Sequence, residues 1–173
     1  MKIYFAAHAT TVDNEAKIAS GWKDVELSEL GIKQAHELGE IFKDIKLDLI
    51  CTSDLKRAVD SVKIAFGEKY PILIDARLRE LNYGDFNGKP SEVVEKMKIE
   101  RIKKSFPNGE SYEQAVARTQ KFYNELKLKN PNSTVLVVGH RATQYGLDLM
   151  AGKKLEELLS VKFKWQPYWE YNF

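Results

Sequence analysis

The sequence predicts an α/β fold, a three-layer sandwich in which a mostly parallel, open sheet carries helices on both faces. The alternation of two kinds of segment indicates this fold. Short apolar runs rich in β-branched residues alternate along the chain with longer segments whose apolar residues recur at helical spacing. Strands that are separated by helices form parallel sheets with both faces covered. The length of 173 residues fits one domain with a sizeable core, so we expect a single domain over residues 1–173.

Local signals place the expected elements in chain order. Ser28 and Asp54 are suited to start helices, and Gly67 is suited to end one. Pro71 can open a strand, because a first strand position needs no backbone donor. Strands are predicted at residues 3–7, 47–52, 71–74 and 134–139, helices at residues 28–45, 54–66, 91–104, 111–129 and 142–150, and a final edge strand within residues 161–173.

Two segments stand apart from this alternation. The weakly apolar stretch 84–106 is a candidate for a small cap above the carboxyl ends of the strands. The C-terminal tail is rich in aromatic residues, which we expect to pack against the core, with a partner surface as the alternative. Its rings belong to Trp165, Tyr168, Trp169 and Tyr171.

Composition narrows the class of protein. The formal net charge is only +2, from 27 basic and 25 acidic residues, so nothing favours nucleic acid or an anionic membrane as a partner. Cys51 is the single cysteine, which rules out an intrachain disulfide. No signal sequence and no membrane-spanning apolar run is evident, so a cytoplasmic protein is expected. The oligomeric state is left open.

Two histidines follow strand-like runs at distant places in the chain. His8 comes directly after the first predicted strand, and His140 comes directly after the strand at 134–139. The carboxyl ends of neighbouring strands in an open α/β sheet are where ligands bind. A single histidine at such a position is more often a structural group, but two at matching positions favour one shared site.

Other polar residues are expected near the same edge. Arg57 falls in the first turns of the helix after the second strand, where a cation opposes the helix dipole unless an anion is bound. Glu80 follows the third strand between apolar neighbours. Thr10, Thr11 and Asn14 follow His8 and offer polar groups to an oxygen-rich ligand, although they also suit a turn.

Taken together, these segments resemble the histidine phosphatase superfamily, also called phosphoglycerate mutase-like. The resemblance covers nearly the whole chain. Each motif is weak alone, but five in the family's order are specific. His8–Asn14 resembles the nucleophile loop, and Ser53–Ala58 resembles the phosphate-binding signature. Leu78–Gly88 resembles the loop that carries the acid. The remaining two motifs are Pro107–Ser111 and Val138–His140.

The resemblance implies a two-step phosphoryl transfer. His8 attacks the phosphorus of a monoester and becomes phosphohistidine, which splits one difficult displacement into two. Glu80 protonates the leaving alcohol and then activates water. Chemistry of this kind requires no metal or cofactor, and its partner is a small phosphorylated substrate. The residues expected to hold the phosphate are Arg57, His140, Thr11 and Asn14.

One departure from the family pattern concerns the residues around the nucleophile. The family has an arginine before the histidine and usually a glycine after it, whereas this chain has Ala7 and Ala9. Arg141, directly after His140, is the candidate for supplying the missing charge. The alternative is that Ala7 marks a disabled site.

Hydrolysis of a phosphomonoester is the first hypothesis for the function. The span from Gly88 to Pro107 leaves little room for a lid over a bisphosphate, and an open site admits water. A cofactor-dependent phosphoglycerate mutase is the nearest alternative. A catalytically impaired pseudophosphatase that binds a phosphate ligand or a protein is the alternative from another class, because of Ala7. The identity of the substrate is left open.

Overall fold

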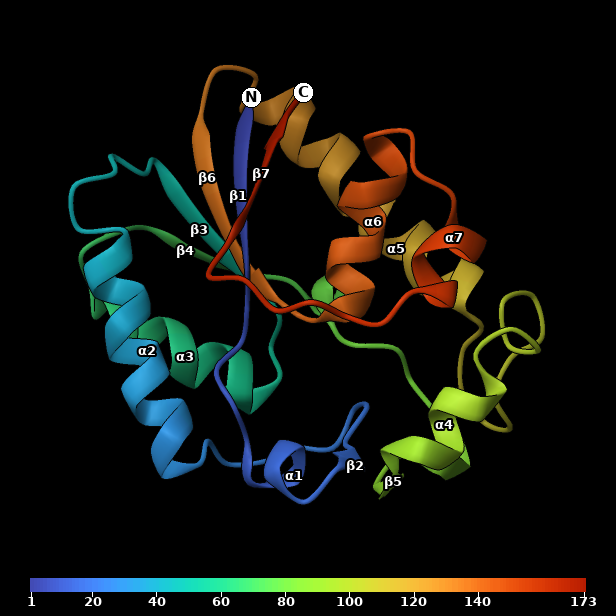
Figure 1. Ribbon diagram of the computed structural model, residues 1–173. Coiled ribbons are helices and arrows are strands. Elements are labelled where there is room, and N and C mark those ends of the chain that lie inside the picture. The colour runs from blue at the N-terminus through green and yellow to red at the C-terminus, as the bar shows by residue number, and fades with distance from the viewer.

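The computed structural model describes residues 1–173, which fold around a five-stranded sheet with the order β4-β3-β6-β1-β7. Strands β4, β3, β6 and β1 are parallel, and β7 is an antiparallel edge strand next to β1 (Figure 1). The mostly parallel α/β sheet predicted from the sequence is therefore confirmed. The strands are β1 (Lys2–Ala7), β3 (Leu49–Thr52), β4 (Ile72–Ile74), β6 (Thr134–Gly139) and β7 (Trp169–Asn172).

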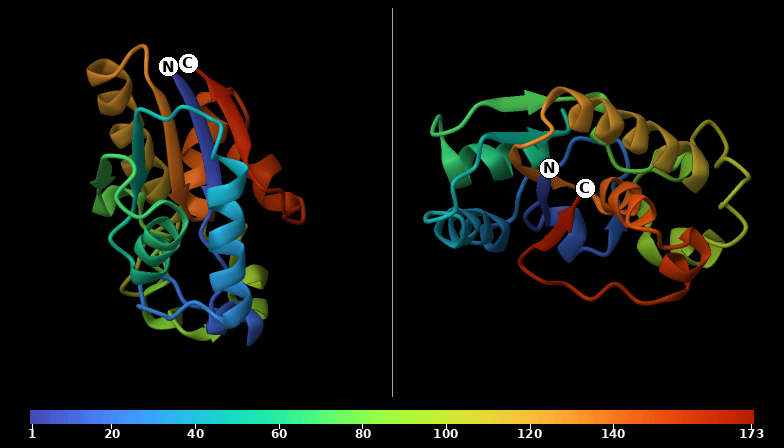
Figure 2. Two further views of the ribbon diagram at one scale, coloured as in Figure 1. Left: turned by 90° about the vertical axis from the view of Figure 1, so that its left-hand side faces the viewer. Right: turned by 90° about the horizontal axis from the view of Figure 1, so that it is seen from above.

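Alternating residues of each central strand build two separate cores. Ile3 and Phe5 of β1 pack under α5 (Tyr112–Lys129) and α6 (Arg141–Met150). Tyr4 and Ala6 pack on the opposite face, under α2 (Glu29–Ile41) and α3 (Lys56–Phe66). In the view from above in Figure 2, the two pairs of helices lie on opposite sides of the sheet. The alternation explains the three layers, because successive strand residues point to opposite faces.

Helix ends follow the local signals in the sequence. The Ser28 hydroxyl caps α2 by accepting the N–H of Gly31 at 3.2 Å. Gly67 ends α3 with a φ of 55°, which glycine adopts without strain. Ser111 caps α5 in a capping box with Gln114.

The segment 84–106 borders the carboxyl ends of the strands. Its short strand β5 (Lys89–Pro90) pairs with β2 (Ile18–Ala19), which follows helix α1 (Val12–Glu15). The helix predicted at 91–104 ends early, as α4 (Ser91–Met97). The main-chain carbonyls of residues 101 and 102 do not continue this helix. They accept the N–H groups of Tyr112 and Glu113 at the start of α5, at 3.1 and 3.0 Å. Two 3-10 turns, Ala76–Leu78 and Gly84–Phe86, flank the loop that carries Glu80.

The C-terminal region differs most from the prediction. A short helix, α7 (Leu155–Ser160), buries Leu155 and Leu159 and was not predicted. The expected edge strand is confined to β7, so residues 161–168 form an irregular segment. Figure 1 shows this segment passing from α7 across the carboxyl end of the sheet to β7. No helix combines the length and the apolar character needed to cross a lipid bilayer.

Candidate active site

The structure brings His8 and His140 together at the carboxyl end of the sheet. The pairing of β1 with β6 continues one residue beyond the strand, where the His8 N–H donates to the Gly139 carbonyl at 2.8 Å. The centroids of the two imidazole rings lie 5.0 Å apart. Two residues 132 positions apart in the chain therefore share one site because their strands are neighbours.

The surroundings of His8 determine which of its ring nitrogens is free. Nδ1 lies 2.7 Å from the carbonyl oxygen of Ala9 and must donate to it, because a carbonyl oxygen only accepts. Nε2 of the neutral ring then carries the lone pair, and it accepts from Nε of Arg57 at 3.3 Å. Burial, followed by the charge of Arg57, lowers the pKa of His8 to about 3. His8 is therefore a neutral imidazole at pH 7.

His140 is oriented through its other nitrogen. Its side chain is 1% exposed, and Nε2 lies 2.7 Å from the Ser53 hydroxyl. Nδ1 is buried and has no partner within the protein. Burial, with the charge of Arg57, lowers the pKa of His140 well below its usual value. A buried, unpaired ring nitrogen beside His8 can serve a ligand.

Arg57 lies at the start of α3 and is almost completely buried. Its two Nη atoms donate to main-chain carbonyls, one to Lys23 at 3.0 Å and the other to Gly21 at 2.8 Å. This leaves Nε facing His8. The carbonyls hold a cation in a fixed position beside the imidazole, and the same position suits an anionic ligand.

The Glu80 carboxylate lies at the N-terminus of α6. Oε2 accepts the N–H of Arg141 at 3.2 Å, and Oε1 accepts the N–H of Ala142 at 3.1 Å. Oε1 also accepts the N–H of Leu81 at 2.8 Å. A negative charge is favourable at this end of a helix. Glu80 is thus placed next to His140, which directly precedes α6.

Thr11 and Asn14 form a capping box around α1. The Thr11 hydroxyl accepts the Asn14 N–H at 3.1 Å, and Asn14 Oδ1 accepts the Thr11 N–H at 3.0 Å. Thr11 is fully buried, whereas Asn14 and Thr10 line the cavity around His8. The hydroxyl of Thr11 is therefore engaged in holding the loop, and the Asn14 side chain faces the site.

Arg141 is held by the side chains of its own helix and of the tail. It donates to Gln144 Oε1 at 2.5 Å and to the Tyr145 hydroxyl at 3.3 Å. The guanidinium carbon lies 4.6 Å from the Tyr145 ring centroid and 4.3 Å from that of Phe163. These are cation–π contacts, and they place Arg141 at the edge of the site.

An open cavity of about 480 Å³ surrounds these groups. Smaller cavities of about 150 and 230 Å³ adjoin it and share Glu80 with it. Ala7 and the tail residues Phe163 and Trp165 contribute to the wall of the 480 Å³ cavity. The remaining lining residues are His8, Thr10, Asn14, Gln34, Glu80, Gly139, His140 and Arg141.

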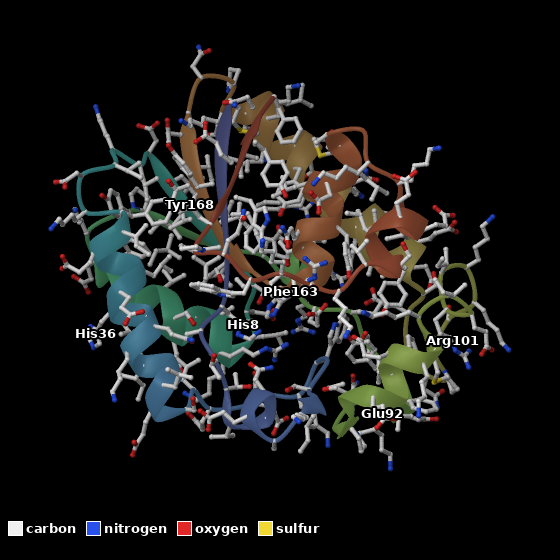
Figure 3. The ribbon with its side chains drawn as sticks, viewed as in Figure 1. His8, His36, Glu92, Arg101, Phe163 and Tyr168 are labelled. Atoms are coloured by element: carbon white, nitrogen blue, oxygen red, sulfur yellow. The ribbon has the colours of Figure 1, made fainter.

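Groups suited to other chemistry lie away from this site. Burial raises the pKa of the Cys51 thiol to about 12, so the thiol stays protonated within the core. His36 is exposed on α2 and points away from His8 in Figure 3. No group of three or more histidine, cysteine, aspartate or glutamate side chains is arranged to hold a metal ion.

Residues 3–163 match the family described as the histidine phosphatase superfamily (branch 1). The chain belongs to this superfamily. A 2,3-bisphosphoglycerate-dependent phosphoglycerate mutase of Streptococcus mutans is 38% identical over 109 residues, which are 59% of this chain and 47% of that protein. The uncharacterized phosphatase PhoE of Bacillus subtilis is 33% identical over 141 residues, which are 81% of this chain and 72% of that protein.

The chain is aligned with only part of the mutases it matches. It covers 47% of the Streptococcus mutans protein and 61% of a Streptococcus pneumoniae mutase. Among solved structures, YhfR of Bacillus stearothermophilus has a TM-score of 0.85 at 25% identity, covering 98% of this chain and 89% of that one. A mycobacterial glucosyl-3-phosphoglycerate phosphatase, solved with VO3, has a TM-score of 0.85 at 23% identity, covering 98% and 91%. The second likeness shows the same fold.

In this member of the superfamily, the loop that carries Glu80 is held by residues to which sequence reasoning gave no role. Arg118 of α5 donates to the carbonyl of Glu80 and pairs with Glu110, in both cases at 2.8 Å. Trp22 Nε1 donates to the same carbonyl at 2.6 Å. The Glu110 carboxylate in turn accepts the Asn82 N–H at 3.0 Å. The motif Pro107–Ser111 thus holds the Glu80 loop in place through Glu110. The residues of the motif do not by themselves indicate this supporting role.

Close contact between two loops explains the glycine in that motif. A Cβ on Gly109 would lie 2.4 Å from the carbonyl oxygen of Asn82, closer than atoms can approach. The backbone of the motif can therefore run directly against the Glu80 loop only with glycine at this position.

Proposed function

We propose that this protein hydrolyses a small phosphorylated metabolite, a phosphomonoester, through a phosphohistidine on His8. The observation that carries the proposal is the state of the His8 ring. Its Nδ1 proton is engaged by Ala9, its Nε2 lone pair faces the cavity beside Arg57, and its pKa is about 3. A neutral imidazole whose unprotonated nitrogen lies next to a fixed cation is suited to attack a phosphoryl group.

The first step forms a bond between Nε2 of His8 and phosphorus, and it breaks the bond between phosphorus and the alcohol oxygen. Glu80, entering as the protonated acid, gives its proton to that oxygen, so the alcohol leaves neutral. In the second step water attacks phosphorus, the P–N bond breaks, and the Glu80 carboxylate takes the proton of the water. Inorganic phosphate leaves, and His8 and Glu80 return to their first state.

The charge on the phosphoryl oxygens is held by several groups throughout. We assign Arg57, the free Nδ1 of His140 and the side chain of Asn14 to direct contact, because each borders the cavity around His8 or touches His8 itself. Thr11 acts by fixing Asn14. Preorganised donors of this kind supply most of the catalysis in phosphoryl transfer.

Arg141 is assigned to the phosphate as the replacement for the arginine that the family has at the position of Ala7. It borders the same cavity as His8, and Ala7 lies in the wall of that cavity. To reach the phosphate, the guanidinium exchanges its hydrogen bond to Gln144 for bonds to phosphoryl oxygens. Residues 84–106 act as a small cap, because Ser91, Val94 and Glu95 line the adjoining cavity of 150 Å³.

The named relatives support this choice and also supply the main alternative. They include an uncharacterized phosphatase and several phosphoglycerate mutases. A mutase passes the phosphoryl group from the histidine to a second alcohol instead of water. Assays with phosphoglycerates separate the two: free phosphate as the product indicates hydrolysis, and an isomerised phosphoglycerate indicates a mutase.

The decisive experiment is a short pulse of labelled phosphomonoester followed by an alkaline quench. Wild-type protein should retain an acid-labile, alkali-stable label, and His8→Ala should retain none. His140→Ala should acquire the label more slowly, and the exposed His36→Ala serves as the matched control with full labelling. Label on His8→Ala excludes the proposed nucleophile. No label on wild-type protein that still binds vanadate favours a pseudophosphatase.

A further inference from the structure

The cavity of about 230 Å³ adjoins the cavity around His8 on the side of Glu80. The two cavities share Glu80, Arg141 and Phe163. If Glu80 protonates the leaving alcohol, the leaving oxygen lies beside Glu80. The organic group attached to that oxygen then extends past Glu80 into the smaller cavity. The lining of this cavity therefore selects the alcohol part of the substrate.

Four of the nine residues that line this cavity are aromatic. Tyr83, Tyr112, Tyr145 and Phe163 contribute four rings, and Val161 adds an apolar side chain. Tyr112 and Tyr145 are each 4% exposed, and their ring centroids lie 6.3 Å apart in an edge contact. Rings that are fixed by packing offer their edges and uncovered faces to another ring.

The charged side chains of the same cavity already have partners within the protein. Lys98 forms an ion pair with Glu95. The guanidinium of Arg141 lies between the rings of Tyr145 and Phe163, and in the proposed function its charge turns to the phosphate and not to this cavity. Burial raises the pKa of Tyr112 and Tyr145, so both phenols are neutral. The lining thus suits a flat, uncharged group better than a second phosphate or a carboxylate.

We propose that this cavity is an aryl subsite, which binds an aromatic ring carried on the alcohol of the phosphomonoester. The proposal rests on the hydrolase function proposed above and names its substrate class. Phe163 comes from the irregular segment 161–168 and closes the wall between the two cavities, near His8 in Figure 3. The tail thereby helps to set substrate choice.

Two non-hydrolysable ligands test the aryl subsite directly. Propylphosphonate and 3-phenylpropylphosphonate have the same charged head and differ by one ring. Calorimetric titration of the wild-type protein should give at least about tenfold tighter binding of the phenyl compound, because a ring buried among rings gains apolar and stacking contacts. Phe163→Ala and Tyr112→Leu should each bring the ratio of the two affinities toward one. Phe173→Ala, which removes a ring at the opposite end of the sheet, should leave the ratio unchanged.

The binding results separate a failure of the aryl subsite from a failure of the proposed function. Equal affinity of wild-type protein for the two phosphonates overturns the aryl subsite, and so does a ratio that persists in both Phe163→Ala and Tyr112→Leu. Vanadate is titrated in parallel as a probe of the phosphate site alone. If vanadate binds while the phosphonates bind equally or not at all, only the aryl subsite fails. If vanadate also fails to bind, the proposed function fails with it.

Discussion

Arg57 and Arg141 border the same site, but the protein holds them in opposite ways. Arg57 is 2% exposed and is fixed by two main-chain carbonyls, with Nε on His8. Arg141 is fixed by side chains alone, between two aromatic rings and next to Gln144. Main-chain carbonyls cannot move without the backbone, whereas side chains can exchange partners. The first charge is therefore permanent at the nucleophile, and the second can respond to a ligand.

The electrostatic effects of the two arginines differ accordingly. After burial, the charge of Arg57 is the next cause that lowers the pKa of both His8 and His140. The charge of Arg141 acts instead on Tyr112 and Tyr145, where it opposes the increase in pKa caused by burial. Arg57 thus adds to the effect of burial on the imidazoles, and Arg141 opposes the effect of burial on the phenols of the adjoining cavity.

The largest effect is expected from Arg57→Gln. Loss of a fixed cation at the transferring phosphoryl group should lower kcat/KM on the order of 10³-fold. Arg57→Lys should recover only part of the activity, because an ammonium cannot reproduce the planar guanidinium. The rate of phosphohistidine formation is the measurement. A loss of less than about tenfold would place Arg57 outside the reaction.

A pair of substitutions tests whether Arg141 replaces the missing arginine. If it does, Arg141→Ala should weaken vanadate binding by about 2–3 kcal/mol, and Ala7→Arg should bring little gain, because two guanidinium groups then compete for the same oxygens. If Ala7 marks a disabled site, Ala7→Arg should raise turnover by orders of magnitude and Arg141→Ala should have little effect. Vanadate affinity and turnover of both variants decide between these outcomes.

A third arginine touches no substrate and sharpens the comparison. Arg118→Met removes one of the two side chains that donate to the Glu80 carbonyl. It should lower kcat for alkyl phosphates about 10–100-fold through misplacement of Glu80. Nitrophenyl phosphate, whose leaving group needs little protonation, should lose much less. Glu110→Gln, which keeps the shape but not the charge, should have an intermediate effect. Equal losses on both substrates would indicate a general structural role for Arg118.

The smallest effect concerns stability at mildly acidic pH. The pKa of His8 is about 3 in the folded protein against 6.5 as its ordinary value, so only the unfolded chain gains a proton between these pH values. His8 alone should therefore lower the free energy of unfolding by up to ~1.4 kcal/mol per pH unit as the pH drops below about 6.5, and His140 adds to this slope in the same direction. Urea unfolding at pH 7 and pH 5 measures this slope.

Variants of His8 and Arg57 test whether His8 causes this pH dependence of the free energy of unfolding. His8→Gln should reduce it, and Arg57→Gln should reduce it in part, because the pKa of His8 then moves back toward its ordinary value. Arg141→Gln should keep the wild-type slope. Identical slopes in wild type and His8→Gln would contradict the account of a His8 that stays neutral in the folded protein.

The site residues that follow strands could be predicted from the sequence. His8, His140 and Arg57 lie close together because parallel strands end at one edge, and that rule needs only the strand pattern and the chain order. Thr11 shows the limit of such reasoning. A polar residue after the nucleophile suggests a ligand contact, but its hydroxyl is used to cap α1.

The supporting residues were beyond sequence reasoning for a physical reason. Arg118 and Trp22 recognise main-chain carbonyls, which every residue has, so no side-chain pattern marks their target. Phe163 was placed in an edge strand by its aromatic neighbours, whereas the chain needs those residues to span the distance from α7 to β7. The cavity that it lines depends on that path.

The two ends of the chain are bonded to each other. The Met1 amino group donates to the Phe173 carbonyl at 2.6 Å, and the Phe173 N–H donates to the Met1 carbonyl at 2.9 Å. A short linker can therefore join these residues in a circular permutant that opens at Gly152, an exposed turn with a φ of 90°. In that permutant, β7 and β1 become a hairpin, so contacts between opposite ends of the sequence become local. Lower contact order favours faster folding. In the permutant, the segment 161–168, which lines the aryl subsite, is also synthesised before His8.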